Sequence, residues 1–119
     1  MTYTITIPDW CPATVNTFLG RHWARKHRLR RAMTEMIGSY AWAQSVPKAT
    51  GKRRVKLTVT GWASGGRLPD KDAFDKLLLD SLKQCWLIFD DSQEFLDGRV
   101  EVELRRGPRS TVIELEDVT

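Results

Sequence analysis

Aspartates gather in one part of a chain that is otherwise basic. Asp70 and Asp72 are separated by one residue, and Asp91 follows after an apolar run. Mg²⁺ prefers oxygen ligands and is commonly held by carboxylates together with substrate phosphates. A metal held in this way activates water and neutralises the charge that develops when a phosphodiester is cut. This spacing of carboxylates is therefore typical of a metal site that acts on nucleic acid.

Helix capping is the alternative explanation for part of the cluster. Asp72 precedes an apolar-periodic run, where an N-cap side chain accepts hydrogen bonds from unpaired backbone amides. Asp75 falls in the first turn, where the helix dipole favours negative charge. Capping explains these two residues but requires neither Asp70 nor the Asp90–Asp91 pair. Spacing alone leaves both explanations open.

Lys76 and Asp91 extend the candidate site beyond the first two carboxylates. Lys76 lies four residues after Asp72, hence on the same helical face, where an ammonium group can stabilise charge on a phosphate in the transition state. The alternative role of Lys76 is a surface ion pair with Asp72 or Asp80, which contributes little to stability. The apolar WLIF segment (86–89) can pack back along the helix and return Asp91 toward Asp72. The sequence permits this return but does not require it.

Hydrophobic periodicity predicts the elements that must position these side chains. Strands alternate with period two, and helices repeat their apolar positions every three to four residues. The longer predicted helix has an apolar face of Leu29, Ala32, Met33, Met36, Ile37 and Tyr40, and the shorter one of Phe74, Leu77, Leu78, Ser81, Leu82 and Cys85. The predicted strands are Tyr3–Ile7, Val55–Trp62, Arg99–Arg106 and Ser110–Asp117, and the predicted helices are Leu19–Ser45 and Asp72–Gln84.

The order strand, helix, strand, helix, strand, strand predicts the fold class. It indicates a single α+β domain (1–119) with a roughly four-stranded sheet, mixed or mostly antiparallel, and two main helices packed on it. Gly107 and Pro108 are typical of a turn and predict a closing hairpin between the last two strands. The order of the strands within the sheet does not follow from the sequence.

The charge distribution indicates a polyanionic partner. From Met1 to Arg67 there are 12 Lys and Arg residues and two acids, a balance of +10, whereas the rest of the chain has a balance of −6. Lys and Arg gain affinity for nucleic acid by releasing counterions from phosphates. A well-solvated basic surface is the alternative explanation. The residues predicted to contact DNA are Arg21, Arg25, Lys26, Arg28, Arg30, Arg31, Lys52, Arg53, Arg54 and Lys56.

Apolar runs, the N-terminal pattern and the cysteines indicate the cellular compartment of the protein. No apolar run is long enough for a membrane helix, and the N-terminus lacks the pattern of a signal peptide. Cys11 and Cys85 are far apart and form no metal-binding motif, which favours buried thiols in a reducing cytoplasm. We therefore expect a cytoplasmic protein with no membrane partner.

The segment from Arg67 to Val100 resembles the RusA-type endodeoxyribonucleases, a family of Holliday-junction resolvases often carried by phages and prophages. The shared pattern is an Asp-x-Asp, a lysine shortly after it, an Asp-x-Leu helix end and a later Asp-Asp. The proline-containing PATVN segment, with Asn16, matches the family's loop after the first strand. The resemblance implies that Asp70, Asp72 and Asp91 are metal-binding catalytic carboxylates and that Lys76 is the catalytic lysine. It further implies a homodimer that cuts branched DNA with Mg²⁺, or with Mn²⁺ in its place, and leaves a 5′-phosphate.

One position departs from the family's pattern. Ala73 stands where the family has asparagine, and Asp75 is a candidate substitute. Two alternatives follow within nucleic-acid metabolism: a catalytically weak junction-binding protein, and a nuclease of the same fold that acts on flaps or forks. A protein-interaction domain whose acids cap a helix is the third.

The remaining aromatic and histidine residues carry less information. His22 and His27 are five residues apart, which does not suit a shared metal, and we assign them to the basic surface. Trp42 and Trp86 fall where core packing explains them. The others, Trp10, Trp23 and Trp62, are candidates for burial or for stacking on an unpaired base.

Overall fold

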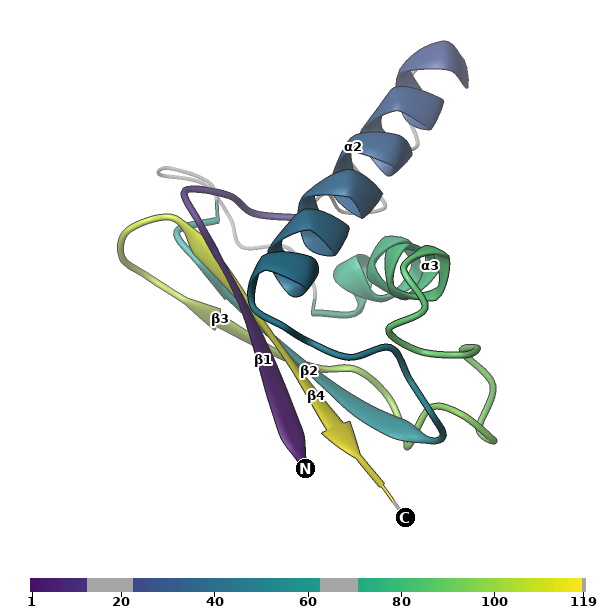
Figure 1. Ribbon diagram of the computed structural model, residues 1–119. Helices are drawn as coiled ribbons and strands as arrows, with labels where there is room; N and C mark the ends of the chain where they lie inside the picture. The colour runs from purple at the N-terminus through teal and green to yellow at the C-terminus, as the bar shows by residue number, and fades with distance from the viewer. Residues whose placement is uncertain (13–22, 63–70, 119) are drawn as a thin grey trace.

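The computed structural model (Figure 1) describes residues 1–12, 23–62 and 71–118, with side chains described except at 23–26, 71 and 72. It confirms the α+β class and the order of elements. The elements are β1 (Thr2–Pro8), α2 (Trp23–Ala43), β2 (Arg53–Thr60), the short 3₁₀ turn η1 (Lys71–Phe74), α3 (Asp75–Gln84), β3 (Glu101–Arg105) and β4 (Ser110–Asp117).

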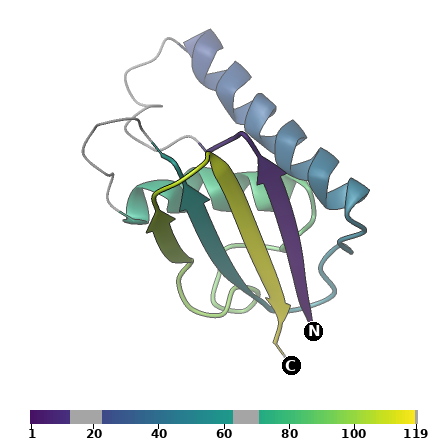
Figure 2. The same ribbon diagram turned by 90° about the vertical axis from the view of Figure 1, so that its left-hand side faces the viewer.

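The four strands form one mixed sheet in the order β1-β4-β2-β3. The β4 strand pairs antiparallel with β1 and β2, and β3 pairs parallel with β2. A parallel pair needs a crossover connection, and η1 with α3 supplies it between β2 and β3. Both helices cover the same face of the sheet, and the other face is open (Figure 2).

The core lies between the covered face of the sheet and the apolar stripes of the two helices. Alternation places one set of strand side chains inward, and the buried members include Ile5, Leu57 and Ile113, which lie side by side on three adjacent strands. The period of α3 buries Leu77, Leu78, Ser81 and Leu82, as the sequence predicted. On α2 the buried residues are Met33, Ile37 and Ala41, whereas Ala32 is exposed and Leu29, Met36 and Tyr40 are half-buried.

The predicted closing hairpin is wrong. The β3 and β4 strands are not neighbours, because β2 lies between them. The short connection from β3 to β4 crosses the end of β2 at Gly61, whose φ is 71°. A Cβ at Gly61 would lie 2.7 Å from the carbonyl oxygen of Gly107 and 2.9 Å from Cα of Arg109, so only glycine permits this crossing. A short glycine-proline loop therefore joins two strands that do not pair.

Both helices end with a Schellman motif that lacks glycine. After α2, the N–H of Ser45 donates to the carbonyl of Trp42, and Ser45 has a φ of 58°. After α3, the N–H of Trp86 donates to Lys83 and the N–H of Leu87 donates to Leu82. Glycine is the usual residue at the left-handed position of this motif, since other residues are strained there.

The start of α3 differs from the prediction. The helix begins at Asp75, and its N-cap residue is Phe74, which makes no side-chain capping hydrogen bond. Asp72 lies earlier, in η1, so the prediction that Asp72 is the N-cap of this helix is wrong. Asp75 does lie in the first turn, as predicted. A 3₁₀ turn is a common lead-in to an α-helix, and it moves the cap two residues along the chain.

The end of α2 protects an edge of the sheet. The side-chain amide of Gln44 accepts a hydrogen bond from the N–H of Thr6 (2.9 Å) and donates one to the carbonyl of Thr6 (2.8 Å). Thr6 lies in the edge strand β1, whose outer backbone groups would otherwise be open to pairing. Gln44 thus acts as a one-residue substitute for a neighbouring strand.

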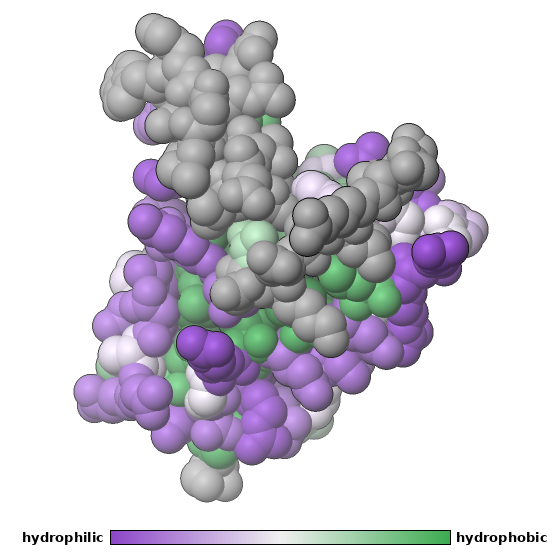
Figure 3. Space-filling model, turned by 180° about the vertical axis from the view of Figure 1, so that it is seen from behind, coloured by the Kyte–Doolittle hydropathy of each residue, from purple (hydrophilic) through white to green (hydrophobic). Residues whose placement is uncertain are grey.

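The surface seen from behind is mostly hydrophilic, and hydrophobic atoms show on it mainly beside the grey residues (Figure 3). Of the two α-helices in the described ranges, neither is long and apolar enough to span a bilayer.

Candidate nucleic-acid interface

A cleft of about 660 Å³ separates α2 from α3. Its residues repeat every three or four positions on each helix, so each set forms one face. The α2 wall carries three basic or histidine side chains, and the α3 wall carries an acid and a lysine. The lining residues are His27, Arg30, Arg31, Thr34 and Glu35 from α2 and Asp80, Lys83 and Gln84 from α3.

Small side chains bring α2 and α3 close together beside the cleft. Thr34 Oγ1 and Ser81 Oγ lie 3.2 Å apart in a hydrogen bond, and Cys85 Sγ donates to the carbonyl of Thr34 at 3.4 Å. A Cβ at Gly38 would lie 3.2 Å from Cys85 Sγ, so α2 approaches the end of α3 closely there. Burial raises the pKa of the Cys85 thiol, which favours its neutral form. These contacts join α2 and α3 at the side of the cleft.

Lys83 connects the α3 wall with Asp91. Its Nζ lies 3.7 Å from Oδ1 of Asp80 and 3.6 Å from Oδ2 of Asp91. Side chains of a helix lean toward its N-terminus, so the ammonium group lies beside Asp80, one turn before the Cα of Lys83. The chain after α3 therefore turns back and brings Asp91 alongside the second half of that helix.

The apolar segment before Asp91 explains this return. Leu87 and Ile88 are 2% and 0% exposed and belong to the core, which fixes the path of the chain after α3. Asp90 then accepts a hydrogen bond from the N–H of Asp91 at 2.9 Å. This hydrogen bond, a second one with the side chain of Asp91 and the nearby charge of Lys83 hold the pKa of Asp90 below its ordinary value. The loop thus presents Asp90 as a carboxylate beside Lys83.

Lys76 lies on the same face of α3 as Lys83. The two are seven residues apart, which is two helical turns, or about 10 Å along the axis. Lys76 is exposed and is the second residue of α3. Lys76, Asp80 and Lys83 therefore form one row on α3, and Asp91 lies beside the Lys83 end of that row.

The other predicted metal ligands cannot be compared with this arrangement. Asp70 lies outside the described residues, and so does the side chain of Asp72. Among the side chains that are described, no three of His, Cys, Asp or Glu lie close enough to hold a metal ion. Asp91 has an exposed carboxylate with the hard oxygen atoms that Mg²⁺ prefers. Its Oδ2 lies 3.6 Å from Nζ of Lys83, in the last turn of α3, whereas Asp72 lies in η1 before the start of this helix.

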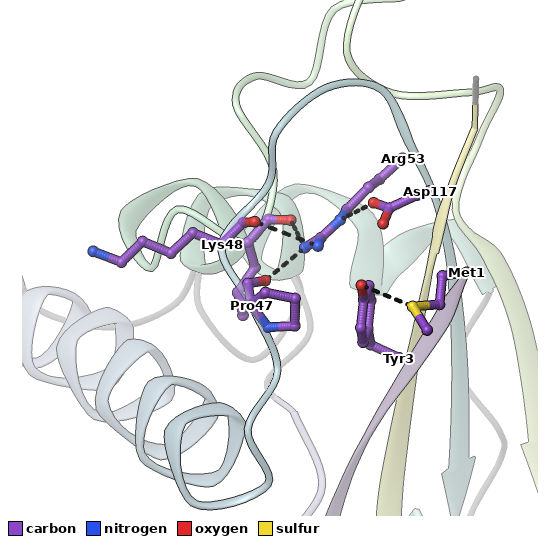
Figure 4. Close-up of polar contacts among 7 residues, drawn as sticks. Met1, Tyr3, Pro47, Lys48, Arg53 and Asp117 are labelled. Atoms are coloured by element: carbon purple, nitrogen blue, oxygen red, sulfur yellow. Dashed lines mark hydrogen bonds and ion pairs between the residues drawn. The ribbon is translucent and has the colours of Figure 1, made fainter.

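The prediction that Arg53 contacts DNA is wrong. Its side chain is 1% exposed and lies over the ring of Tyr3, with 5.3 Å from Cζ to the ring centroid. Its guanidinium donates to Oδ1 of Asp117 at 2.8 Å and to the carbonyl oxygens of Leu87 and Pro47 at 2.8 and 3.1 Å (Figure 4). Arg53 is therefore too buried to contact a phosphate. Its hydrogen bonds instead connect the C-terminal strand with the loops that follow the two helices.

The remaining predicted contacts fall into two groups. Arg28, Arg30 and Arg31 are exposed on α2, and Arg30 and Arg31 line the cleft. Arg54 and Lys56 alternate with buried residues of β2 and so face the open side of the sheet, away from the helices. Arg54 there pairs with Asp97 and Glu116, and Asp97 raises the pKa of its guanidinium. Lys52 is half-buried just before β2; Arg21 lies outside the described residues, as do the side chains of Arg25 and Lys26.

Two tryptophans were assigned wrongly to the core. Trp42 is 85% exposed and Trp86 is 55% exposed. Trp62 is half-buried and packs edge-on against the buried Phe74, with ring centroids 5.3 Å apart. Trp42 could have been recognised from its spacing, because it lies about a quarter turn away from the buried Ala41 on α2. Trp86 carried no such signal, because its position depends on how α3 ends.

A comparison with models of known protein families finds no match to this chain, and a search of curated proteins finds none either.

Proposed function

We propose that this protein is a metal-dependent endonuclease that cuts branched DNA, with the four-way junction as its substrate. The observation that carries the proposal is the row of Lys76, Asp80 and Lys83 on α3, with Asp91 beside it, next to a cleft whose opposite wall is basic. This arrangement combines a carboxylate and lysines with a surface suited to phosphates.

The residues of the chain divide the work between binding and hydrolysis. Arg30 and Arg31 bind backbone phosphates, which positions the strand without reading its sequence. Asp70, Asp72 and Asp91 would hold Mg²⁺ or Mn²⁺, as the resemblance implies, and a metal held there would neutralise charge and lower the pKa of water. Lys76 stabilises the negative charge that grows on the phosphate.

The symmetry of the substrate favours a homodimer as the active form of the protein, and its cysteines favour the cytoplasm. A four-way junction has near two-fold symmetry, and its resolution requires two cuts on opposing strands. A symmetric dimer with one site in each subunit matches this substrate. The free cysteines, Cys11 buried and Cys85 half-buried, suit a reducing compartment.

Because Ala73 replaces the asparagine of the family's pattern, two alternative functions remain. Ala73 is half-buried in η1, and Asp75, the candidate substitute for the family's asparagine, is half-buried at the start of α3. A junction-binding protein without cleavage, or a nuclease specific for flaps or forks, would use the same cleft. Cleavage assays on several substrates separate these functions.

The first prediction concerns catalysis by Asp91. The protein is incubated with a labelled four-way junction, a matched duplex and a flap, with Mg²⁺ or with EDTA. We expect paired nicks near the junction only with Mg²⁺, and a loss on the order of 100-fold in cleavage rate for Asp91→Asn and for Asp72→Asn. Both variants should still bind the junction in EDTA.

The control is Glu94→Gln, which removes an exposed carboxylate from the same loop. Its cleavage rate should equal that of the wild type, so a general charge effect is separated from the role of Asp91. Junction binding without cleavage under any divalent metal would contradict the enzymatic function, and preferred cleavage of the flap would change the substrate.

A further inference from the structure

Trp86 occupies a position that folding alone disfavours. It is the first residue after the C-cap of α3 and has a φ of 58°. Glycine is favoured there because a bulky side chain strains the left-handed backbone. The backbone has no alternative at this point, since the N–H of Trp86 donates to Lys83 and its carbonyl accepts from Ala49 at 2.8 Å.

Burial does not compensate for this strain. The side chain of Trp86 is 55% exposed, so it buries far less apolar surface than the core tryptophan that its size would allow. The neighbouring Leu87 is buried and provides the hydrophobic contact that usually accompanies this helix end. A strained residue whose side chain points to solvent indicates a role outside folding.

Trp42 provides a second exposed aromatic surface. It is 85% exposed near the end of α2. It follows Glu35 by seven residues and Gly38 by four, so it continues the α2 face that lines the cleft. Gly38 meets Cys85 across the helix interface, and Trp86 is the residue after Cys85. The two tryptophans therefore lie near the C-terminal ends of α2 and α3, which approach each other at Gly38 and Cys85.

The chemistry of this surface fits an unpaired DNA base. Arg30 and Arg31 provide cationic groups along the α2 wall of the cleft, Arg31 in an exposed ion pair with Glu35, and the exposed aromatic rings lie near the ends of the two helices that form it. Proteins that bind single strands combine these two features, because phosphates follow the charged groove and bases stack on the rings. A basic helix beside the rings favours this occupant over a second copy of the same basic helix, which it would repel.

We propose that Trp42 and Trp86 form a stacking platform for unpaired bases of a DNA strand whose phosphates lie in the α2–α3 cleft. This inference rests on the proposed action on DNA and names the feature that the site recognises: bases unpaired at a branch point. It predicts a preference for junctions and single strands over continuous duplex.

The test separates binding from folding with two glycine substitutions. Trp86→Gly should raise the Tm by about 3 °C, because it relieves the left-handed strain, and should weaken binding of a dye-labelled oligo(dT) by roughly 5- to 100-fold. Ser45→Gly relieves the same strain at the end of α2, where Ser45 has a φ of 58°, and should raise the Tm without changing affinity. Trp42→Ala should weaken oligo(dT) binding by a similar factor.

Duplex binding distinguishes this platform from the proposed nuclease. The tryptophan variants should bind a continuous duplex as the wild type does, with an unchanged salt dependence. Wild-type affinity for oligo(dT) in Trp42→Ala and Trp86→Gly would overturn the platform, even if Mg²⁺-dependent cleavage is observed. A change in their oligomeric state by sedimentation would also overturn it, because a second copy would then be the occupant. Tryptophan-dependent binding without any cleavage would support the platform and count against the nuclease.

Discussion

Arg53 shows how one charged side chain organises the end of the sheet. Its guanidinium satisfies the carbonyl of Leu87 after α3, the carbonyl of Pro47 after α2 and the carboxylate of Asp117 in β4. Three distant parts of the chain therefore share one donor group. A buried guanidinium is tolerated only when its donors are matched in this way.

We predict that Arg53→Met destabilises the protein by about 2–4 kcal/mol. Methionine keeps the apolar length of the side chain but leaves buried carbonyl oxygens without a donor. The free energy of unfolding is measured in urea. The matched control is Arg54→Met, the next residue, whose ion pairs are solvent-exposed and should matter much less. Equal losses in the two variants would show that burial of Arg53 does not determine its contribution.

At the scale of elements, Gly61 decides the topology of the sheet. The connection between β3 and β4 passes over the end of β2 in close backbone contact, and Gly61 donates its N–H to the carbonyl of Arg105 at 3.0 Å. Without this close approach the loop could not place β4 beyond β2. The position of β4 between β1 and β2 thus depends on a residue outside both β3 and β4.

We predict that Gly61→Ala destabilises the protein by about 2 kcal/mol or more. The added methyl group meets backbone atoms that cannot move aside, and the left-handed φ strains any other residue. Thermal unfolding provides the measurement. Gly51→Ala is the control, because no atom lies within 4 Å of its added Cβ. A Tm for Gly61→Ala as high as that of the control would refute the role of the crossing.

At the scale of the whole molecule, the excess positive charge of α2 is separated from the open face of the sheet. The cleft has Arg30, Arg31 and Lys83 against the acids Glu35 and Asp80, whereas on the open face bases pair with acids, such as Arg105 with Glu103 at 2.9 Å. A strand of DNA is therefore expected to approach the helices and not the sheet.

We predict that this separation controls the salt dependence of DNA binding. Arg30→Gln combined with Arg31→Gln should reduce the slope of log affinity against log salt by about 0.9 for each phosphate that the arginines no longer neutralise. The control is Lys56→Gln with Arg105→Gln, which removes the same charge from the open face. Affinities are measured on one junction over a series of NaCl concentrations. A similar decrease in slope for both pairs of substitutions would mean that DNA does not bind preferentially at the cleft.

Much of the fold was predictable, because hydrophobic periodicity is a local property. The order of strands and helices, the α+β class and the buried face of α3 all followed from spacing, and the structure confirms them, with element ends that differ by a few residues. The candidate site was predictable in part. Lys76 and Asp91 were proposed as site residues from residue type and spacing and stay a prediction, whereas Lys83, which pairs with Asp91, was not proposed although it lies seven residues after Lys76 on the same face.

What the sequence determined by itself is the kind of each element and the presence of carboxylates, lysines and arginines. What only the tertiary structure decided is which of them meet. The structure set the order of the strands. It also buries Arg53 and exposes Trp42 and Trp86, although arginine is usually exposed and tryptophan usually buried. Each depends on contacts between segments far apart in the chain, which local propensity does not encode. The pairing of Asp91 with Lys83 arises in the same way, because the burial of Leu87 and Ile88 sets the path that brings the two together.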